Sequence, residues 1–173
     1  MTEKYGTDAL RMSLVYGIAP ASDFVVSEDK IRAQRNFVNK IWNASRFVLM
    51  ICDKFPNVEK SPLSKGDLEG LNPDDISILK NLNKIITSTT ADINRYHFGQ
   101  ASENLYQFFW HDFCDVYIEK AKDRNEDVVP VLLTVLITSL KLLHPFIPFV
   151  TESVYQILRE KIKLDEDQLI TAS

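Results

Sequence analysis

The sequence predicts an all-α fold, a helical bundle of about five to six helices. Three features of its 173 residues support this prediction. Apolar residues recur at spacings of three and four along most of the chain, only five glycines are present, and the alternation of β-branched residues that is typical of strands is scarce. A chain of this length fits one domain and can bury about two thirds of the surface that its unfolded form would expose.

The N-terminal third of the chain contains two predicted helices and a long loop. Residues 5–16, "YGTDALRMSLVY", form a short helix that ends in the loop around Gly17. Ser27 is a favourable N-cap for a long second helix that runs to about Lys54. Residues 55–73 are rich in Pro, Gly and Ser, and they form the longest predicted loop.

Caps and prolines delimit the remaining helices. Asn72 is a natural N-cap for a third helix, because Pro73 suits the first helical position and the acidic Asp74 and Asp75 suit the positive end of the helix dipole. The "HPFIPF" sequence, in which two prolines interrupt the helical pattern, separates the last two helices. The helices that follow the third cover about residues 101–122, 128–143 and 151–162.

Charge is unevenly distributed along the chain. The 24 acidic and 20 basic residues give a net charge of -4, which argues against a general, sequence-independent nucleic-acid binder. Between Ser27 and Lys60, however, seven basic residues accompany four acidic ones, a local charge of +3. This segment is therefore locally basic within an acidic chain.

The cysteines and the apolar segments indicate a cytoplasmic protein. Cys52 and Cys114 lie inside apolar helical patterns, which predicts buried, reduced thiols rather than a disulfide framework. No stretch approaches the roughly 20 apolar residues of a membrane span. The first residues, from Met1 to Lys4, do not resemble a signal peptide. We therefore expect no membrane partner.

The predicted helix from Ser27 to Lys54 carries two different stripes. At about 100° of rotation per residue, one stripe is expected to face the core. It consists of Ile31, Val38, Ile41, Trp42, Ser45, Val48, Leu49 and Cys52. The second stripe is centred about 150° away. It consists of Asn36, Lys40, Asn43 and Phe47, with Arg32, Arg35, Asn39 and Arg46 on the flank between the two stripes.

Two interpretations of the second stripe are open. In the first, Phe47 packs against another helix and the amides satisfy buried backbone groups at a helix crossing. In the second, the stripe is a surface for single-stranded RNA, where Phe47 stacks on bases, amides contact base edges, and Lys or Arg contacts phosphate. Stacking a base on an aromatic ring contributes about 1–3 kcal/mol, which would justify an exposed phenylalanine.

Four longer segments resemble a known family. They are "YGTDALRMSLVYG", "RNFVNKIWNASRFVLM", "LYQFFWHDFCDVYIEKAK" and "LLHPFIPFVTESVYQIL". In this order, from Tyr5 to about Ile170, they closely resemble the C-terminal part of the valyl-tRNA synthetases, which are class I aminoacyl-tRNA synthetases. Isoleucyl- and leucyl-tRNA synthetases share the layout and the His-Pro-Phe turn, but the second and third segments look valine-type.

The resemblance implies a fold and a function. In this family the region is a helical bundle that binds the anticodon arm of tRNA. Residues 1–24 would form a helix and loop that link to the catalytic domain, and residues 25–173 would form the anticodon-binding domain of a valine-tRNA ligase. The family's ATP-handling signatures, one like His-Ile-Gly-His and the other Lys-Met-Ser-Lys-Ser, are absent. ATP and Mg²⁺ would therefore serve only the full-length enzyme, and we expect this fragment alone to be inactive and to hold no cofactor.

Candidate RNA-binding residues follow from the same resemblance. Valine anticodons end in A and C, and reading these bases requires hydrogen-bond donors and acceptors beside an aromatic platform. We expect Phe47 to stack, the asparagines of the second stripe to contact base edges, and Lys40 and Arg46 to contact phosphate or bases. The loop before this helix lacks the arginines of some family members, for which Lys30 or Arg32 would substitute. The candidates are Lys30, Arg32, Asn36, Lys40, Asn43, Arg46 and Phe47.

Other groups of reactive side chains give weaker signals. His111, Cys114, Asp115 and Glu119 recur at helical spacing, but zinc needs four ligands and the other histidines are not spaced to complete a site. Asp112 shares a face with two of these acids, yet a di-metal site in a bundle needs Glu-x-x-His pairs on two helices. We therefore expect core aromatics with surface ion pairs in this segment, and no metal.

The sequence leaves two alternative functions open. One is the equivalent domain of an isoleucyl- or leucyl-tRNA synthetase, which has the same layout. The other is a helical protein-interaction module without RNA binding.

Overall fold

A computed structural model of the chain describes residues 1–19, 22–23, 25–56, 62–63, 70–162, 164 and 168–169. These residues form helices and no strand, which confirms the predicted all-α fold. Most of the predicted loop over residues 55–73 lies outside the described residues. The elements are α1 (Thr2–Tyr5), α2 (Thr7–Ser13), α3 (Glu28–Lys54), α4 (Pro73–Asn94), α5 (Phe98–Gln107), the π-helical η1 (Phe108–Tyr117), α6 (Ile118–Ala121), the 3-10 turn η2 (Glu126–Val128), α7 (Val129–Leu143) and α8 (Pro148–Lys161).

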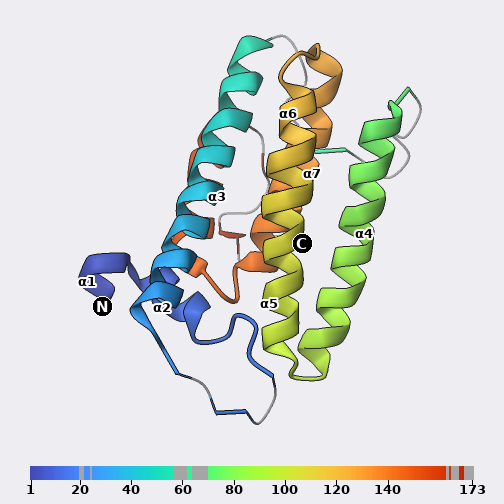
Figure 1. Ribbon diagram of the computed structural model, residues 1–173. Helices are drawn as coiled ribbons and strands as arrows, with labels where there is room; N and C mark the ends of the chain where they lie inside the picture. The colour runs from blue at the N-terminus through green and yellow to red at the C-terminus, as the bar shows by residue number, and fades with distance from the viewer. Residues whose placement is uncertain are drawn as a thin grey trace.

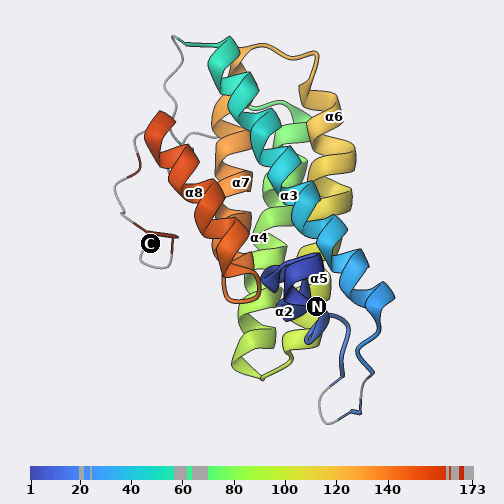
Figure 2. The ribbon, with the colours of Figure 1, turned by 90° about the vertical axis from the view of Figure 1, so that its left-hand side faces the viewer.

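The helices surround α7. In Figure 1, α3, the continuous rod α5–η1–α6, and α4 lie side by side, with α7 behind the rod. Figure 2 shows α8 on the other side of α3 from α6. The central α7 contacts α3, α4, α5 and α8, and most of its apolar side chains are fully buried. Its sequence is apolar on nearly every side, as expected for a helix surrounded by others.

Side-chain caps fix the starts of α3 and α4. The hydroxyl of Ser27 accepts a hydrogen bond from the amide of Lys30 at 3.3 Å. The side chain of Asn72 accepts from the amides of Asp74 and Asp75 at 2.9 and 3.0 Å, and Asp75 accepts in return from the amide of Asn72 at 3.3 Å. Both predicted helix starts are therefore confirmed, and α4 begins with a capping box.

The first predicted helix is two helices. Gly6, at φ 89°, ends α1 and precedes α2, and α2 stops at Ser13. A single helix over residues 5–16 is therefore wrong, because the positive φ of Gly6 is incompatible with a continuous helix. Tyr5 and Ala9 pack against Ile31 of α3, so this N-terminal part lies on the bundle.

The short α2 is fastened to the "HPFIPF" corner between α7 and α8. The buried carboxylate of Asp8 accepts hydrogen bonds from the amides of Phe149 and Val150 at 3.3 and 2.6 Å. Arg11 donates to two carbonyl groups of the corner at 3.1 and 3.2 Å. Pro148 occupies the first turn of α8, so this helix starts three residues earlier than predicted.

The fourth predicted helix contains an unexpected π-helical stretch. It starts at Phe98 rather than about residue 101, and its middle, η1, has the i→i+5 hydrogen bonding of a π-helix. The rings of Phe109 and Phe113 lie 5.5 Å apart, and those of Phe113 and Tyr117 lie 6.3 Å apart. These buried rings follow one another along η1, which agrees with the core aromatics predicted for this segment.

A buried ion pair joins this rod to α4. Asp75 accepts a hydrogen bond from the hydroxyl of Tyr117 and pairs with both terminal nitrogens of Arg124, one of them at 2.9 Å. Arg124 also pairs with Asp127. Burial alone would raise the pKa of Asp75, but the bonds from Arg124 and Tyr117 outweigh it and hold that pKa below its usual value.

The buried face of α3 differs in part from the predicted stripe. Ile41 and Val48 are fully buried as predicted, but Phe37, outside the predicted stripe, is also fully buried. Trp42 is 38% exposed, so its assignment to the core is wrong. The helix contacts α2, η1, α7 and α8, and its buried arc is consequently wider than one stripe and centred differently. Cys52 is buried, as is Cys114, and they form no disulfide, as predicted.

Candidate nucleic-acid interface

A shallow groove of about 180 Å³ separates α3 from the rod that carries η1 and α6. One wall comes from α3 and the other from the end of η1, from α6 and from the residue that follows it. We call this hollow the α3–η1 groove. It is lined by Lys40, Asn43, Ala44, Phe47, Cys114, Ile118, Glu119 and Lys122. The structure thus brings together Lys40, Asn43 and Phe47 of the predicted second stripe.

Phe47 belongs partly to the core and partly to the groove. Its side chain is half-buried, packs against the main hydrophobic core, and lines the α3–η1 groove. The ring is therefore neither sealed beneath other chain segments nor fully open to solvent. One part of the ring is available to a ligand, while the rest stabilises the contact between α3 and the rod.

Lys40 is held by the opposite wall. Its ammonium lies 2.8 Å from the carboxylate of Asp115 and 5.4 Å from the centre of the Trp110 ring. His111 also contacts Asp115, at 3.2 Å. Burial alone would lower the pKa of Lys40, but the hydrogen bond that its ammonium donates to Asp115 outweighs burial and raises that pKa, so the ammonium stays charged. Because an ammonium has three donors and Asp115 uses one of them, Lys40 can still donate to a phosphate at the groove.

The floor of the groove is apolar, and its rim is polar. Cys114 and Ile118 are each 5% exposed, and burial raises the pKa of the Cys114 thiol to about 12, which keeps it neutral. At the rim, both carboxylate oxygens of Glu119 accept hydrogen bonds from Lys122, at 2.7 and 2.6 Å. Asn43 is exposed, and within the part of the chain that the structure describes its amide has no hydrogen-bond partner. The groove therefore offers an aromatic edge, an amide, a carboxylate and two ammonium groups.

The other predicted site residues lie outside this groove. Asn36 is exposed one helical turn before Lys40. Arg46 instead borders an apolar hollow of about 40 Å³ between α3 and α8. Lys30 and Arg32 lie in the first turns of α3, and Arg32 pairs with Asp29. The structure therefore spreads the candidates along α3, with only three at one hollow.

The sequence interpretation missed the contribution of the opposite wall. The sequence pattern presented Asp115 and Glu119 only as weak candidates for a metal site or for acid-base chemistry. The groove instead uses Glu119 and Lys122 at its rim, and Asp115 holds Lys40. Among the described residues, no group of three or more His, Cys, Asp or Glu side chains is arranged to hold a metal ion. The signal that could have revealed this wall was the recurrence of charged residues every three to four positions from Asp115 to Lys122.

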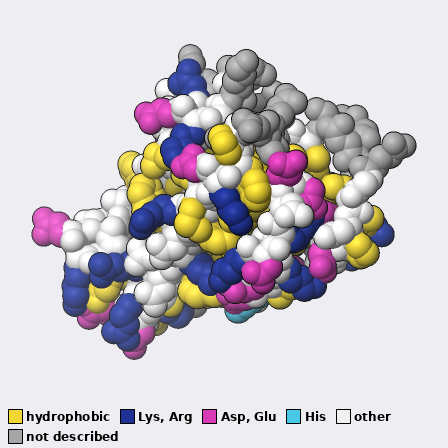
Figure 3. Space-filling view, turned by 90° about the horizontal axis from the view of Figure 1, so that it is seen from above, with side chains coloured by type: hydrophobic (Ala, Val, Ile, Leu, Met, Phe, Trp, Pro, Cys, Tyr) yellow, Lys and Arg dark blue, Asp and Glu magenta, His cyan; other side chains and the backbone are white. Residues whose placement is uncertain are grey.

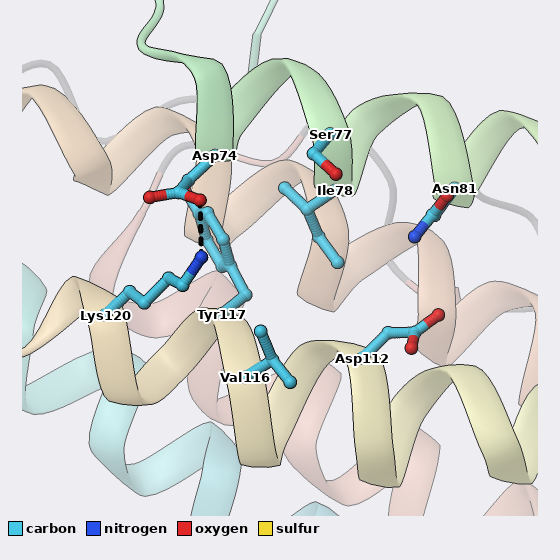
Figure 4. A pocket seen from close by; sticks show the side chains of 8 residues that line it. All are labelled: Asp74, Ser77, Ile78, Asn81, Asp112, Val116, Tyr117 and Lys120. Atoms are coloured by element: carbon cyan, nitrogen blue, oxygen red, sulfur yellow. Dashed lines mark hydrogen bonds and ion pairs between the residues drawn. The ribbon is translucent and has the colours of Figure 1, made fainter.

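A second hollow, of about 80 Å³, lies between α4 and the rod, and Figure 4 shows it from close by. Lys120 pairs there with Asp74 at 2.6 Å. Asp112 points into the hollow from η1, opposite Asn81, and burial raises the pKa of Asp112. Two carboxylates accompany one ammonium here, so this side of the rod is less suited to phosphate than the α3–η1 groove.

Surface charge is mixed. Figure 3 looks onto the end of the bundle where α3 ends, and basic and acidic side chains intermingle there with hydrophobic ones. In the described part of the chain, no helix combines the length and the apolar character that a membrane crossing needs.

Comparison with known proteins identifies relatives. Residues 75–173 match the model of a family described as "Anticodon-binding domain of tRNA ligase". A valine–tRNA ligase of Clostridium tetani is 41% identical over 180 residues, which cover 99% of this chain and 19% of that protein. A valine–tRNA ligase of Bacillus thuringiensis subsp. konkukian is 44% identical over 165 residues, which cover 90% of this chain and 18% of that protein. The chain thus spans about a fifth of the length of these relatives.

Solved structures share the fold. LeuRS of Agrobacterium radiobacter K84, in a ternary complex with tRNA and LeuAMS, superposes with a TM-score of 0.70 at 19% identity, covering 95% of this chain and 19% of that one. Free methionyl-tRNA synthetase of Mycobacterium tuberculosis gives a TM-score of 0.68 at 16% identity, covering 99% of this chain and 36% of that one. The family match covers more than half of the chain, including the η1 wall of the groove. The chain therefore belongs to the family of anticodon-binding domains of tRNA ligases.

Proposed function

We propose that the chain is the anticodon-binding domain of a valyl-tRNA synthetase, which contributes tRNA binding to the ATP-dependent attachment of valine to its tRNA. Identities of 41% and 44% with valine–tRNA ligases support this specificity, whereas the likeness to the LeuRS and methionyl enzymes is in fold. The chain has neither ATP-handling signature. In this proposal ATP and Mg²⁺ therefore bind the catalytic domain of the full-length cytoplasmic enzyme, and this chain alone does not activate valine.

The observation that carries the proposal is the composition of the α3–η1 groove. Phe47 offers part of an aromatic ring, Asn43 a rotatable amide, and Lys40 and Lys122 positive charge at the opening. Single-stranded RNA is recognised by this combination of stacking, base-edge hydrogen bonds and phosphate contacts.

The remaining candidates would extend the contact along α3. Asn36 lies one turn from Lys40 on the same face, where a second base edge or the adjoining backbone would reach it. Arg46 is placed for the phosphate backbone rather than for a base in the groove, because it borders the other side of α3. Lys30 and Arg32 would contact phosphates beyond the N-terminal end of the groove.

The central test compares valine and isoleucine tRNA transcripts for binding to the 173-residue chain by fluorescence anisotropy at low salt. We expect tighter binding of the valine tRNA. Phe47→Ala should weaken it by about 1–3 kcal/mol, because the stacking surface is lost. Since Phe47 also packs against the core, Phe47→Leu is the companion variant, because it keeps apolar volume but removes the flat ring.

Met50→Ala provides a matched control, because Met50 is an apolar side chain on the same helix, 58% exposed and outside the groove. Unchanged tRNA binding by this control is expected. Absence of tRNA binding by the folded wild-type chain would favour a protein-interaction module, and a preference for the isoleucine tRNA would favour the isoleucyl relative.

A further inference from the structure

The turn between α4 and α5 exposes two aromatic rings. Tyr96 is 77% exposed and Phe98 is 42% exposed, and their ring centres lie 6.1 Å apart in an edge-to-face arrangement. The turn lies at the end of the bundle where α3 begins (Figure 1 and Figure 2). Resting on the proposed function, we propose that this turn is a second RNA contact, in which Tyr96 stacks on an unpaired base of the tRNA and Arg95 binds a neighbouring phosphate.

The backbone of the turn places Tyr96 at a position that favours glycine. The amide of His97 donates to the carbonyl of Asp92 at 2.8 Å. The amide of Tyr96 donates to the carbonyl of Ile93 at 3.0 Å, so α4 ends in a Schellman motif. Tyr96 has φ 61°, and in the described parts of the chain it is the one non-glycine residue with a positive φ. Such a φ costs a bulky residue more than it costs glycine, so the backbone does not account for a tyrosine here.

Packing does not account for the tyrosine either. A buried ring would stabilise the fold, but a ring that stays mostly in water contributes little. The hydrogen-bonded turn and the edge of Phe98 nevertheless restrict where the Tyr96 ring lies. A ring that is both exposed and restricted suits stacking, because it loses little conformational freedom when a base binds.

The charge of the turn favours RNA as the partner. Residues 93–100 contain one arginine and no acidic residue, on a chain whose net charge is -4. Arg95 is exposed, and within the residues that the structure describes its guanidinium has no acidic partner. The preceding acid, Asp92, accepts a hydrogen bond from the side-chain amide of Asn104 at 3.3 Å. An exposed ring beside an unpaired guanidinium can bind a base and a phosphate of single-stranded RNA.

This contact is separate from the α3–η1 groove. Phe47 follows Glu28, the first residue of α3, by 19 residues, or about 29 Å at a rise of about 1.5 Å per residue. The turn lies toward the start of α3, and Gly99 in the first turn of α5 lies against the backbone of Ile18, in the segment that leads to α3. One base cannot contact both Phe47 and Tyr96, so the turn would bind a different nucleotide from the groove.

The test measures RNA affinity and stability on the same variant. A valine tRNA transcript is titrated against the 173-residue chain and its Tyr96→Gly variant by fluorescence anisotropy, and both proteins are unfolded in urea. Tyr96→Gly should bind about fivefold to hundredfold more weakly, as for the loss of one stacked base. Its urea midpoint should stay equal or rise, because glycine adopts the positive φ without steric cost.

Three further variants sharpen the test. Tyr96→Phe keeps the ring, so its affinity should stay within about twofold of wild type. Arg95→Ala should reduce the slope of log affinity against log salt by about one. Phe149→Ala is the matched control, because it removes a ring that is 61% exposed in the first turn of α8, and it should leave tRNA affinity unchanged.

The outcomes separate this inference from the proposed function. Suppose that the wild-type chain binds the transcript and Phe47→Leu weakens binding, but Tyr96→Gly and Arg95→Ala change neither affinity nor salt slope. The RNA contact at the turn is then overturned in favour of a protein partner there, and the proposed function stands. Weaker binding by Tyr96→Gly together with a lower urea midpoint would make Tyr96 a structural residue and would also overturn the inference. If the folded wild-type chain does not bind the transcript, the proposed function and this inference both fail.

Discussion

Replacing Asp75 with alanine should destabilise the bundle strongly. Asp75 is only 1% exposed, and it accepts hydrogen bonds from Tyr117, from Arg124 and from the backbone amide of Asn72. It connects the first turn of α4 to the end of η1 and to the turn after α6. One substitution therefore removes a helix cap and a buried ion pair together.

The size of the effect follows from what remains after the substitution. The Arg124 side chain is 15% exposed and would keep only the exposed Asp127 as an ionic partner. Removing one member of a buried ion pair costs about 3–5 kcal/mol. Because Arg124 keeps one partner, we expect the lower end, a loss of about 3 kcal/mol. For a domain whose total stability is about 5–15 kcal/mol, this is a large fraction.

Urea unfolding followed by circular dichroism measures the loss as a lower midpoint at a similar slope. Asp74→Ala is the matched control, because Asp74 is the preceding residue of the same helix but pairs with Lys120 at the surface, where the two side chains are 45% and 52% exposed. That control should lose no more than about 1 kcal/mol. Equal losses in the two variants would refute the assignment of a stabilising role to the buried pair.

The same pair predicts a pH dependence. The folded pKa of Asp75 is lowered, since the bonds from Arg124 and Tyr117 outweigh burial, so its contribution is complete above the unfolded pKa of about 4. That contribution is lost as the pH falls from about 4 through the folded pKa. The stabilities of wild type and Asp75→Ala should therefore converge in acid, and parallel differences at all pH values would contradict the argument.

Two further predictions concern RNA binding and packing. Lys40→Ala should reduce the slope of log affinity against log salt by about one, whereas Lys84→Ala, on α4 away from the groove, should not change it; identical slopes would remove Lys40 from the phosphate contacts. Gly99→Ala should lower stability by about 1–2 kcal/mol in urea unfolding, because overpacking costs about 1–3 kcal/mol and alanine recovers up to about 1 in a helix. The added Cβ would clash with the backbone carbonyl oxygen of Ile18, its nearest neighbour, and would lie 2.7 Å from the amide nitrogen and 2.8 Å from the carbonyl carbon of the same residue. An unchanged unfolding midpoint would show that the Ile18 backbone moves away at little cost.

Local chemistry made the helix starts predictable. Ser27, Asn72 and Asp75 act within three residues of the amides that they cap, so the sequence alone contains the whole interaction. The break at Gly6 was missed, because a glycine inside an apolar pattern gives no indication of its φ angle. The π-helical geometry of η1 has no sequence signature comparable to a cap.

The sequence predicted only the α3 wall of the candidate site, because the spacing along one helix is local and the opposite wall is not. Spacing along one helix placed Lys40, Asn43 and Phe47 on one face. Asp115 on the opposite wall lies 75 residues after Lys40 along the chain, so the pairing of these two side chains depends on tertiary packing. The sequence wrongly assigned Trp42 to the core, because α3 contacts several helices and does not bury one narrow stripe.

The hydrogen bonds between α2 and the corner before α8 bear on where the chain can be truncated. The amides of Phe149 and Val150 in the first turn of α8 donate to the carboxylate of Asp8, which lies more than a hundred residues earlier in the chain. Asp8 therefore caps the N-terminus of α8 from near the other end of the chain. Met12, fully buried in the main core, adds a hydrophobic anchor to the same junction. We therefore expect that removing residues 1–24 would leave the first amides of α8 without the Asp8 carboxylate and would leave a cavity where Met12 packs, and that it would lower the stability of the remaining bundle.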